Sequence, residues 1–270
     1  MLKQRKSSTK EQIERKIKKG VGLGTLKRYE PWIKTHDISS RGRTTRIKSW
    51  KTERVHHLLS DNEIAYFLLL EWNEDVVDIR EQFPLLPVEI TVDIADTIGV
   101  KHPTNPKTKE AVVMTTDFLI TIRRNNKVSD IARTLKYACD LDNYRTIEKF
   151  EIERKFWASQ GIDWGIVTEK EINAVMADNI KELHQSYWLN DDPSFSQKNV
   201  DTFYEYFCET RNHRPGFPIA AFLKEFDNRM GFSGGTGIQL LKYLLSHKNI
   251  RTDMTKKILY RKETLDDFYC

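Results

Sequence analysis

The feature that most constrains the fold is a pair of β-rich runs separated by a short polar turn. Residues 112–121 are mostly apolar or β-branched, but Asp117 stands among them. A polar turn at 123–127 leads into a second β-rich run at 128–137. Two such runs on either side of a turn predict a β-hairpin. The chain therefore forms a sheet that also has to accommodate a carboxylate.

Helices and further strands are predicted on both sides of this hairpin. Ser60-Asp-Asn-Glu63 is a capping-box pattern in front of an apolar run, and it predicts the start of a helix. Helices are expected at about 60–73 and 145–160, and strands at 76–80 and 164–168. The order helix, strand, hairpin, helix, strand predicts an α/β domain with a mixed sheet.

The chain becomes mainly helical after Thr168. Helical runs are expected at 169–187, 200–210, 219–229 and 237–247, and β-like segments at 250–252 and 257–261. Three short helices followed by a small hairpin are typical of a winged-helix module. We therefore expect an α/β domain with a basic N-terminal arm at 1–168 and a winged-helix-like domain at 169–270.

The charge of the chain is unevenly distributed. Residues 1–60 contain 17 Lys and Arg but only 5 Asp and Glu, although the net charge of the whole chain is +5. A strongly basic segment on a near-neutral body favours contact with a polyanion such as DNA, and a solvated tail is the alternative. Tyr29, Trp32 and Trp50 interleave with these charges and could help to grip phosphates. The candidate DNA-binding residues are Arg41, Arg43, Arg46, Lys48, Lys51 and Arg54.

The cysteines and the hydropathy pattern restrict the class of protein further. Cys139, Cys208 and Cys270 are far apart and form no Cys-x-x-Cys pair, which argues against a zinc knuckle and against a disulfide framework. No apolar run approaches the roughly 18 residues needed to span a bilayer. The first residues also lack the apolar region of a secretory signal. We expect a cytoplasmic protein without a membrane segment.

Asp117 and Lys136 mark the candidate active site. A carboxylate inside an apolar strand is costly unless it binds a metal or accepts hydrogen bonds. Thr134 and Lys136 lie two residues apart on the returning run, so their side chains project from one face. The turn would bring that face beside Asp117, and Glu63 near the start of the upstream helix could supply a second carboxylate.

Two carboxylates and a lysine suit metal-dependent hydrolysis of a phosphodiester. Mg²⁺ is typically held by one or two carboxylates with water and phosphate, and a nearby lysine can stabilise developing negative charge. Each residue also has a structural explanation. Glu63 fits the N3 position of a capping box, Asp117 a hydrogen-bonding aspartate, and Lys136 an exposed lysine at a strand end. Spacing alone leaves these alternatives open.

A series of motifs runs in order through about residues 10–180. It includes His57-Leu-Leu-Ser-Asp-Asn-Glu63 and the segments 70–72, 78–85, 101–103, 114–119, 145–149, 151–154 and 168–172, together with Lys136. This series resembles the TnsA family, the endonuclease subunits of heteromeric cut-and-paste transposases. The resemblance implies a restriction-endonuclease-like first domain and a winged-helix-like second domain.

The resemblance also implies a function and a set of site residues. A family member would cut the 5′ strands at transposon ends, using Mg²⁺ or Mn²⁺ as a substitute. Its partners would be transposon-end DNA, a transposase of the DDE type and an AAA+ regulator, in a bacterial cytoplasm at the nucleoid. Glu63 and Asp117 would be metal ligands and Lys136 the catalytic lysine, with Glu153 as a possible accessory acid. Thr134 replaces a glutamine of the family and would offer an oxygen near the metal.

Two other functions fit the same observations. One is a non-catalytic DNA-binding adaptor of a transposition complex whose nuclease core has decayed. The other is a restriction-type endonuclease that acts alone. The three intact positions Glu63, Asp117 and Lys136 favour the transposase subunit.

Overall fold

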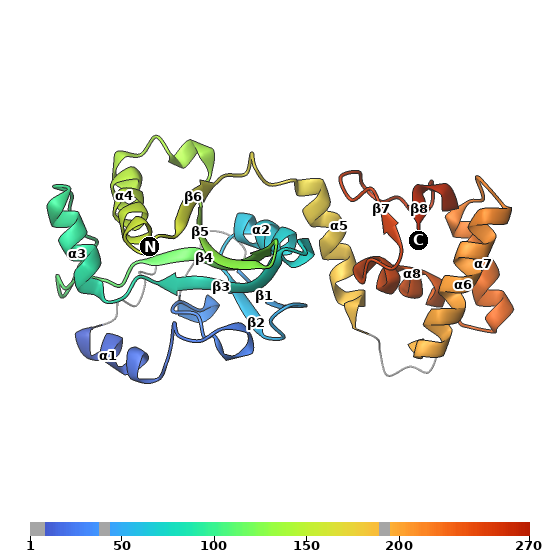
Figure 1. Cartoon of the computed structure of the whole chain (residues 1–270), viewed down its shortest axis with the longest axis horizontal. Coiled ribbons are helices and arrows are strands. Elements are labelled where there is room, and N and C mark those ends of the chain that lie inside the picture. Colours follow the sequence, from blue (N-terminus) through green and yellow to red (C-terminus); the bar gives the residue numbers. More distant parts are fainter. Residues whose placement is uncertain (1–8, 38–43, 189–194) are drawn as a thin grey trace. The chain divides into compact units, whose positions relative to one another are not determined.

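The computed structural model describes residues 9–37, 44–188 and 195–270, and it divides the chain into two units (Figure 1). The first unit ends at Ile172 and the second begins at Asn173. The sequence-based division after residue 168 falls in the loop that precedes this point. In the described part of the chain, no helix is both long and apolar enough to cross a membrane.

A four-stranded mixed sheet forms the centre of the first unit. Its strands lie in the order β3 (Val76–Pro84), β4 (Thr115–Arg124), β5 (Lys127–Leu135) and β6 (Asp163–Val167). The first three are antiparallel, and β6 runs parallel to β5. The predicted hairpin is confirmed as β4–β5. Its two turn residues, Asn125 and Asn126, have φ of 49° and 60°, as a two-residue hairpin turn requires.

Both faces of the sheet are covered by helices of the first unit. These are α2 (Asp61–Trp72), α3 (Val88–Thr97) and α4 (Tyr144–Ser159). On β4, Phe118 packs against Tyr66 of α2, with ring centroids 5.8 Å apart. Its neighbour Leu119 belongs to a buried cluster with Phe156 and Trp157 of α4. The sequence prediction of a mixed α/β domain is therefore confirmed.

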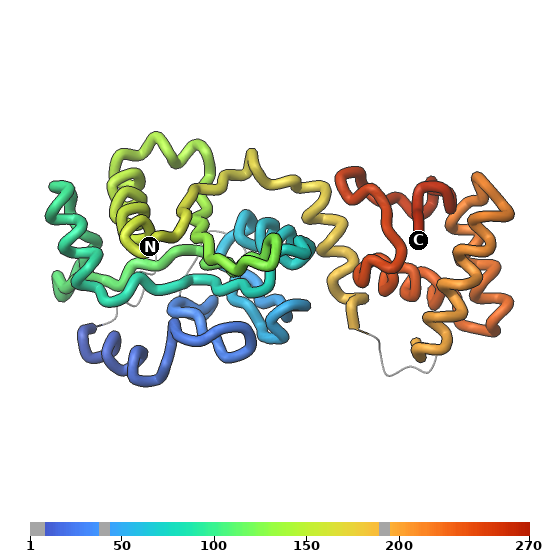
Figure 2. The backbone as a smooth tube through the Cα atoms, viewed as in Figure 1, coloured from blue at the N-terminus to red at the C-terminus, as the bar shows by residue number. Residues whose placement is uncertain are grey.

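The described part of the basic N-terminal segment packs against this unit instead of extending from it (Figure 2). Thr9 caps α1 (Lys10–Lys18) through a capping box. Trp32 is buried in a cluster with Ile13 and Val21, and Tyr29 donates a hydrogen bond from its hydroxyl to the Glu81 carbonyl, 3.0 Å away. These residues thus belong to the folded domain, followed by the hairpin of β1 (Thr45–Lys48) and β2 (Val55–Leu58).

The second unit is mainly helical, as predicted. Its helices are α5 (Ala174–His184), α6 (Gln197–His213), α7 (Ile219–Met230) and α8 (Thr236–Ser246). The terminal hairpin was predicted wrongly. The short strand β7 (Arg251–Thr252) pairs with β8 (Phe268–Tyr269), and not with residues 257–261. The reason is burial, since Phe268 is a fully buried side chain and draws the last residues of the chain onto the core.

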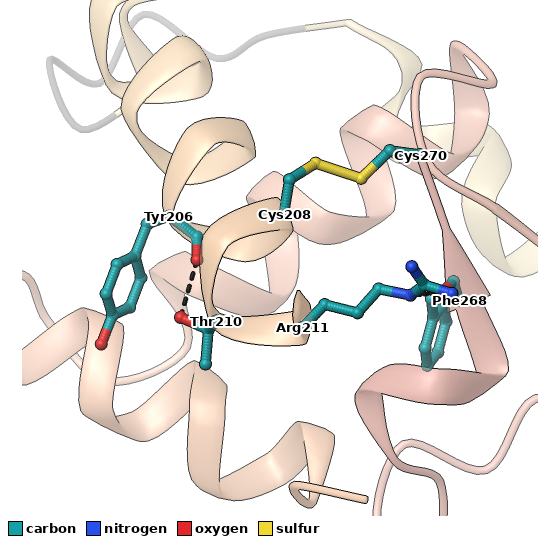
Figure 3. The surroundings of a disulfide bond; sticks show 6 residues. All are labelled: Tyr206, Cys208, Thr210, Arg211, Phe268 and Cys270. Carbon is teal, nitrogen blue, oxygen red and sulfur yellow. Dashed lines mark hydrogen bonds between the residues drawn. A yellow bond between two sulfur atoms is a disulfide. The ribbon is translucent and has the colours of Figure 1, made fainter. Parts of the chain in front are cut away.

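A disulfide joins Cys208 of α6 to Cys270 (Figure 3). The cysteine spacing argued against a disulfide framework, so this bond was not predicted, while Cys139 is free. The two residues are 62 positions apart in sequence, but the fold brings their Cα atoms to 6.7 Å. Arg211, one turn along α6, donates a hydrogen bond to the Phe268 carbonyl at 2.7 Å. Sequence spacing could not reveal this pairing, because it depends on how the tail returns to α6.

A buried ion pair fastens the β1–β2 hairpin to β3. Arg54 donates a hydrogen bond to one Glu81 oxygen at 2.8 Å, and it also bonds the second oxygen. The Arg54 guanidinium lies over the Tyr29 ring, 5.0 Å from its centroid. Burial alone would raise the pKa of Glu81, but His56 and Arg54 hold this pKa well below its usual range. Glu81 therefore stays ionised inside the domain.

The change Glu81→Gln should destabilise the first unit by about 3–5 kcal/mol, because it leaves the Arg54 charge buried without a partner. Denaturation in guanidinium chloride measures this loss. The matched control is Glu53→Gln, which removes an exposed ion pair with Lys27 and should cost at most about 1 kcal/mol. Equal losses in the two variants would contradict the prediction.

The same pair predicts a pH dependence. The folded-state pKa of Glu81 is lowered, so its stabilisation is present above the unfolded-state pKa of about 4.3. It is lost as the pH falls through the lower folded-state pKa. Glu81→Gln should abolish this part of the acid dependence of unfolding.

Candidate active site

The three predicted catalytic residues reach one hollow of the first unit. Its volume is about 390 Å³, and it lies where α2, α4 and the ends of β3, β4 and β5 meet. The polar side chains at this hollow include Glu63, Gln82, Asp117, Thr134, Lys136 and Glu153. The structure therefore brings together residues that are as many as 90 positions apart in the sequence.

Glu63 is both a helix cap and a member of the hollow. Its backbone N–H donates to the Ser60 hydroxyl at 3.2 Å, as expected for an N-cap. Its carboxylate accepts hydrogen bonds from the Leu59 N–H at 2.9 Å and the Ser60 hydroxyl at 3.1 Å. Burial and the nearby Asp117 carboxylate raise the pKa of Glu63 to about 8. The two interpretations of Glu63 are therefore compatible.

Asp117 is held from both neighbouring strands. The Leu135 N–H donates to Asp117 Oδ2 at 2.7 Å, and Gln82 Nε2 donates to Oδ1 at 3.2 Å. Leu135 ends β5 and Gln82 lies in β3, so the carboxylate sits between the strands that flank β4. The hydrogen bonds compensate in part for placing a charge in an apolar segment.

Gln82 is the member of the hollow that the sequence did not reveal. It is buried, and its φ of 48° lies in the left-handed region. A residue held there costs of order 1–3 kcal/mol, and such residues cluster at functional sites. An amide within a strand gives no sequence signal, so sequence reasoning could not have separated Gln82 from an ordinary strand residue.

Lys136 lies just beyond β5, where its backbone N–H donates to the Val167 carbonyl at 3.0 Å. Its ammonium is 3.4 Å from an Asp140 oxygen, and the side chain is about one third exposed. An ion pair at this exposure contributes little stability. A phosphate in the hollow could therefore compete with Asp140 for the ammonium.

Glu153 of α4 is buried, and one of its carboxylate oxygens has three hydrogen-bond donors. It accepts from the Thr116 hydroxyl at 2.6 Å, from Trp164 Nε1 at 3.0 Å and from the Thr134 hydroxyl. Burial raises the pKa of Glu153 to about 7, although these hydrogen bonds lower it and Asp117 raises it slightly. The Thr134 hydroxyl thus donates its proton to Glu153, and its role as a metal ligand stays a prediction.

The donor set fits a small divalent cation held by two carboxylates. In the described ranges, no group of three or more His, Cys, Asp or Glu is arranged to hold a metal ion. Glu63, which is buried, and Asp117, which is half-buried, nevertheless form a pair of carboxylates whose mutual repulsion adds to burial in raising the pKa of Glu63. A divalent cation would relieve that repulsion, and Mg²⁺ commonly takes one or two carboxylates and completes its shell with water and phosphate.

The candidate DNA-binding residues separate into three groups. Arg41 and Arg43 lie outside the described residues. Arg46 and Lys48 occupy exposed alternate positions of β1, and Lys51 follows in the turn. Arg54 is buried in its ion pair with Glu81, so it is not carried forward as a DNA contact. The same holds for Tyr29 and Trp32, which are both buried.

The fold and the hollow define a two-unit protein, with an α/β unit that carries a paired-carboxylate site and a mainly helical unit. Residues 73–169 match the family model described as TnsA-like endonuclease N terminal. Residues 171–254 match the model described as TnsA endonuclease C terminal. The chain belongs to the TnsA family, and the resemblance seen in its motifs is confirmed.

A curated relative supports this assignment. Over 184 residues the chain is 47% identical to the transposon Tn7 transposition protein TnsA of Escherichia coli. The match covers 68% of this chain and 66% of the relative, so the chain spans slightly less than two thirds of that protein.

The raised pKa of Glu153 predicts a pH-dependent effect of Glu153→Gln. The pKa is raised on folding to about 7, so wild-type stability from this group is present below about pH 4.3 and is lost as the pH rises through the folded-state value. Without added metal, Glu153→Gln should therefore gain stability relative to wild type between pH 5 and pH 8, by on the order of 2 kcal/mol.

Chemical denaturation at the two pH values measures this gain. Glu151→Gln is the matched control, because Glu151 lies on the same helix and its pKa is lowered, mainly by a hydrogen bond from Arg154. It should show no such gain. A Glu153→Gln variant whose relative stability is the same at both pH values would disprove the assignment.

Proposed function

We propose that this chain is the endonuclease subunit of a heteromeric transposase and cuts the 5′ strands at transposon ends. The observation that carries the proposal is the arrangement of Glu63, Asp117 and Lys136 around one hollow, in a chain of the TnsA family. The matching family models are described as endonucleases, and the relative is named as a transposition protein. The first unit would then be a restriction-endonuclease-like core.

Glu63 and Asp117 would hold the divalent cation, which would be Mg²⁺, with Mn²⁺ as a substitute. When bound, such an ion polarises the scissile phosphate and lowers the pKa of a water. Other groups of the chain would orient these two carboxylates. The Leu135 N–H and the Gln82 amide orient Asp117, while the Ser60 hydroxyl and Leu59 N–H orient Glu63.

Lys136 would face the developing negative charge of the phosphate. Its ammonium leaves a weak ion pair with Asp140 and gains a stronger one with a phosphate that carries more charge in the transition state. Glu153 would act indirectly, by holding the strands that carry the site. Its hydrogen bonds with Thr116 and Thr134 tie α4 to β4 and β5 beside Asp117.

The DNA and the partner proteins would bind other surfaces of the chain. Exposed Arg46 and Lys48, with Lys51, would contact phosphates of transposon-end DNA. A DDE-type transposase would cut the other strands, and an AAA+ regulator would bind the C-terminal unit. The succession of α6, α7 and α8 followed by the β7–β8 pair supports a winged-helix-like arrangement of that unit.

Asp117→Ala should abolish 5′-strand cleavage by the assembled transposase, with a loss of at least about 100-fold, because one of two candidate metal ligands is removed. The assay contains Mg²⁺, transposon-end DNA and the partner transposase, whose own strand cleavage serves as an internal control. Asp75→Asn is the matched control, because Asp75 pairs with Arg124 on the surface.

Unchanged 5′ cleavage by Asp117→Ala would refute the catalytic proposal. A wild-type chain that assembles on the ends but never cleaves would instead indicate a non-catalytic adaptor. Cleavage of arbitrary DNA without the partner would indicate an endonuclease that acts alone.

The double variant Arg46→Ala/Lys48→Ala should weaken binding of DNA similarly for all sequences. It should also reduce the slope of log Kobs against log[salt] by about 2, since each phosphate contact contributes about 0.9. Fluorescence anisotropy at several salt concentrations measures the slope. Lys127→Ala, at the exposed start of β5, is the control. An unchanged slope in the double variant would exclude β1 from the DNA interface.

A further inference from the structure

Gln82 places an amide beside Asp117 in the candidate active site. The register of β3 with β4 passes from Glu81–Phe118 to Phe83–Thr116, which leaves Gln82 opposite Asp117. Its Nε2 donates to Asp117 Oδ1 at 3.2 Å. The side chain is about 2% exposed, so the contact is not one of many that a surface glutamine samples.

A second contact holds the other end of the amide. The Thr115 hydroxyl donates to Gln82 Oε1 at 3.3 Å. An ionised carboxylate only accepts hydrogen bonds, so the NH₂ group of the amide is the part directed at Asp117, and the amide oxygen is left to accept from Thr115. The Thr115–Gln82–Asp117 chain of hydrogen bonds therefore has a defined direction.

The backbone conformation of Gln82 indicates that the glutamine side chain has a role of its own. Its φ is 48°, a conformation that non-glycine residues adopt infrequently. Its carbonyl accepts a hydrogen bond from the Trp32 N–H at 3.2 Å. A glycine would take up this conformation without a steric cost and could keep the carbonyl contact. The backbone alone therefore does not account for a glutamine at this position.

We propose that Gln82 is a positioning residue, which holds the Asp117 carboxylate in the orientation that binds the divalent cation. The inference rests on the proposed nuclease function. Gln82 fixes one carboxylate oxygen from β3 while the Leu135 N–H fixes the other from β5. Removing the amide leaves Asp117 in place but lets its carboxylate rotate, so metal affinity falls while the fold is kept.

The variants Gln82→Gly and Gln82→Leu separate this role from a structural one. Gln82→Gly removes the side-chain amide and also the steric cost of a positive φ at this position. Gln82→Leu removes the amide but keeps most of the side-chain volume. If the residue were only structural, the glycine variant would behave like wild type. If it positions Asp117, both variants lose metal affinity, and the glycine variant does so with an unchanged or higher Tm.

Titration of the full-length chain with Mn²⁺, followed by the EPR signal of the free ion, measures affinity independently of cleavage. The Kd for Mn²⁺ should rise about 10-fold in both Gln82 variants, the loss typical for a partner of a metal ligand. In cleavage assays, the half-saturating Mg²⁺ concentration should rise more than the maximal rate falls. Asn126→Gly is the matched control, because it relieves a positive φ of 60° at the β4–β5 turn, and its Kd should not change.

Thr115→Val provides a further test that leaves the β3 backbone untouched. It removes the hydroxyl that orients the amide and should raise the Kd for Mn²⁺ in the same direction by a smaller factor. It decides the question if a Gln82 variant does not fold.

Wild-type Mn²⁺ affinity in both Gln82 variants, with a loss in Asp117→Ala, would overturn the role of Gln82 and leave the proposed function standing. Wild-type Mn²⁺ affinity and cleavage in Asp117→Ala would overturn the proposed function itself. The two failures are thus distinguishable within one set of proteins.

Discussion

The repulsion between the buried Glu63 carboxylate and the half-buried Asp117 carboxylate is the interaction on which the candidate site depends. Glu63 comes from the first turn of α2 and Asp117 from the middle of the sheet, and their proximity contributes to a Glu63 pKa of about 8. Glu63 is held by the cap of α2, and Asp117 by donors from β3 and β5. The N-terminus of α2, the register of β3 with β4 and the end of β5 therefore each supply hydrogen-bond donors to one of these two carboxylates.

Local signals in the sequence predicted the elements that carry these charges. The capping pattern before Glu63 and the polar turn after β4 depend on neighbouring residues, so both were visible in the sequence. The turn is formed, and Ser60 caps α2 as predicted, but the Glu63 carboxylate accepts from the Leu59 N–H and the Ser60 hydroxyl and not from the Ser60 N–H of a full capping box. Gln82 and the Cys208–Cys270 pair depend on contacts between distant segments. The same is true of the β7–β8 pairing. No periodicity or spacing rule encodes such contacts, which is why these features emerged only from the fold.

The basic N-terminal segment shows where a count of charges misleads. Its excess of Lys and Arg indicated a surface for a polyanion, but the structure uses part of this segment internally. Arg54 neutralises Glu81 inside the domain, and Trp32 and Tyr29 fill the core. Arg46 and Lys48 differ from Arg54 because the alternation of β1 directs them to solvent. The sequence shows that these side chains are positively charged, but whether each one is buried depends on strand register.

Burial raises the pKa of both Glu63 and Glu153, but the charge of Asp117 ranks second for Glu63 and last for Glu153, and this difference favours Glu63 as the partner of Asp117 in the proposed cation site. Glu153 accepts hydrogen bonds from two hydroxyls and an indole N–H, which offset part of the effect of burial on its pKa, and Asp117 contributes little. For Glu63, the charge of Asp117 is the largest cause after burial. A cation gains most where negative charges face each other, because it removes their repulsion as well as binding them. The pair Glu63 and Asp117 is therefore the metal site to test, with Glu153 supporting the strands behind it.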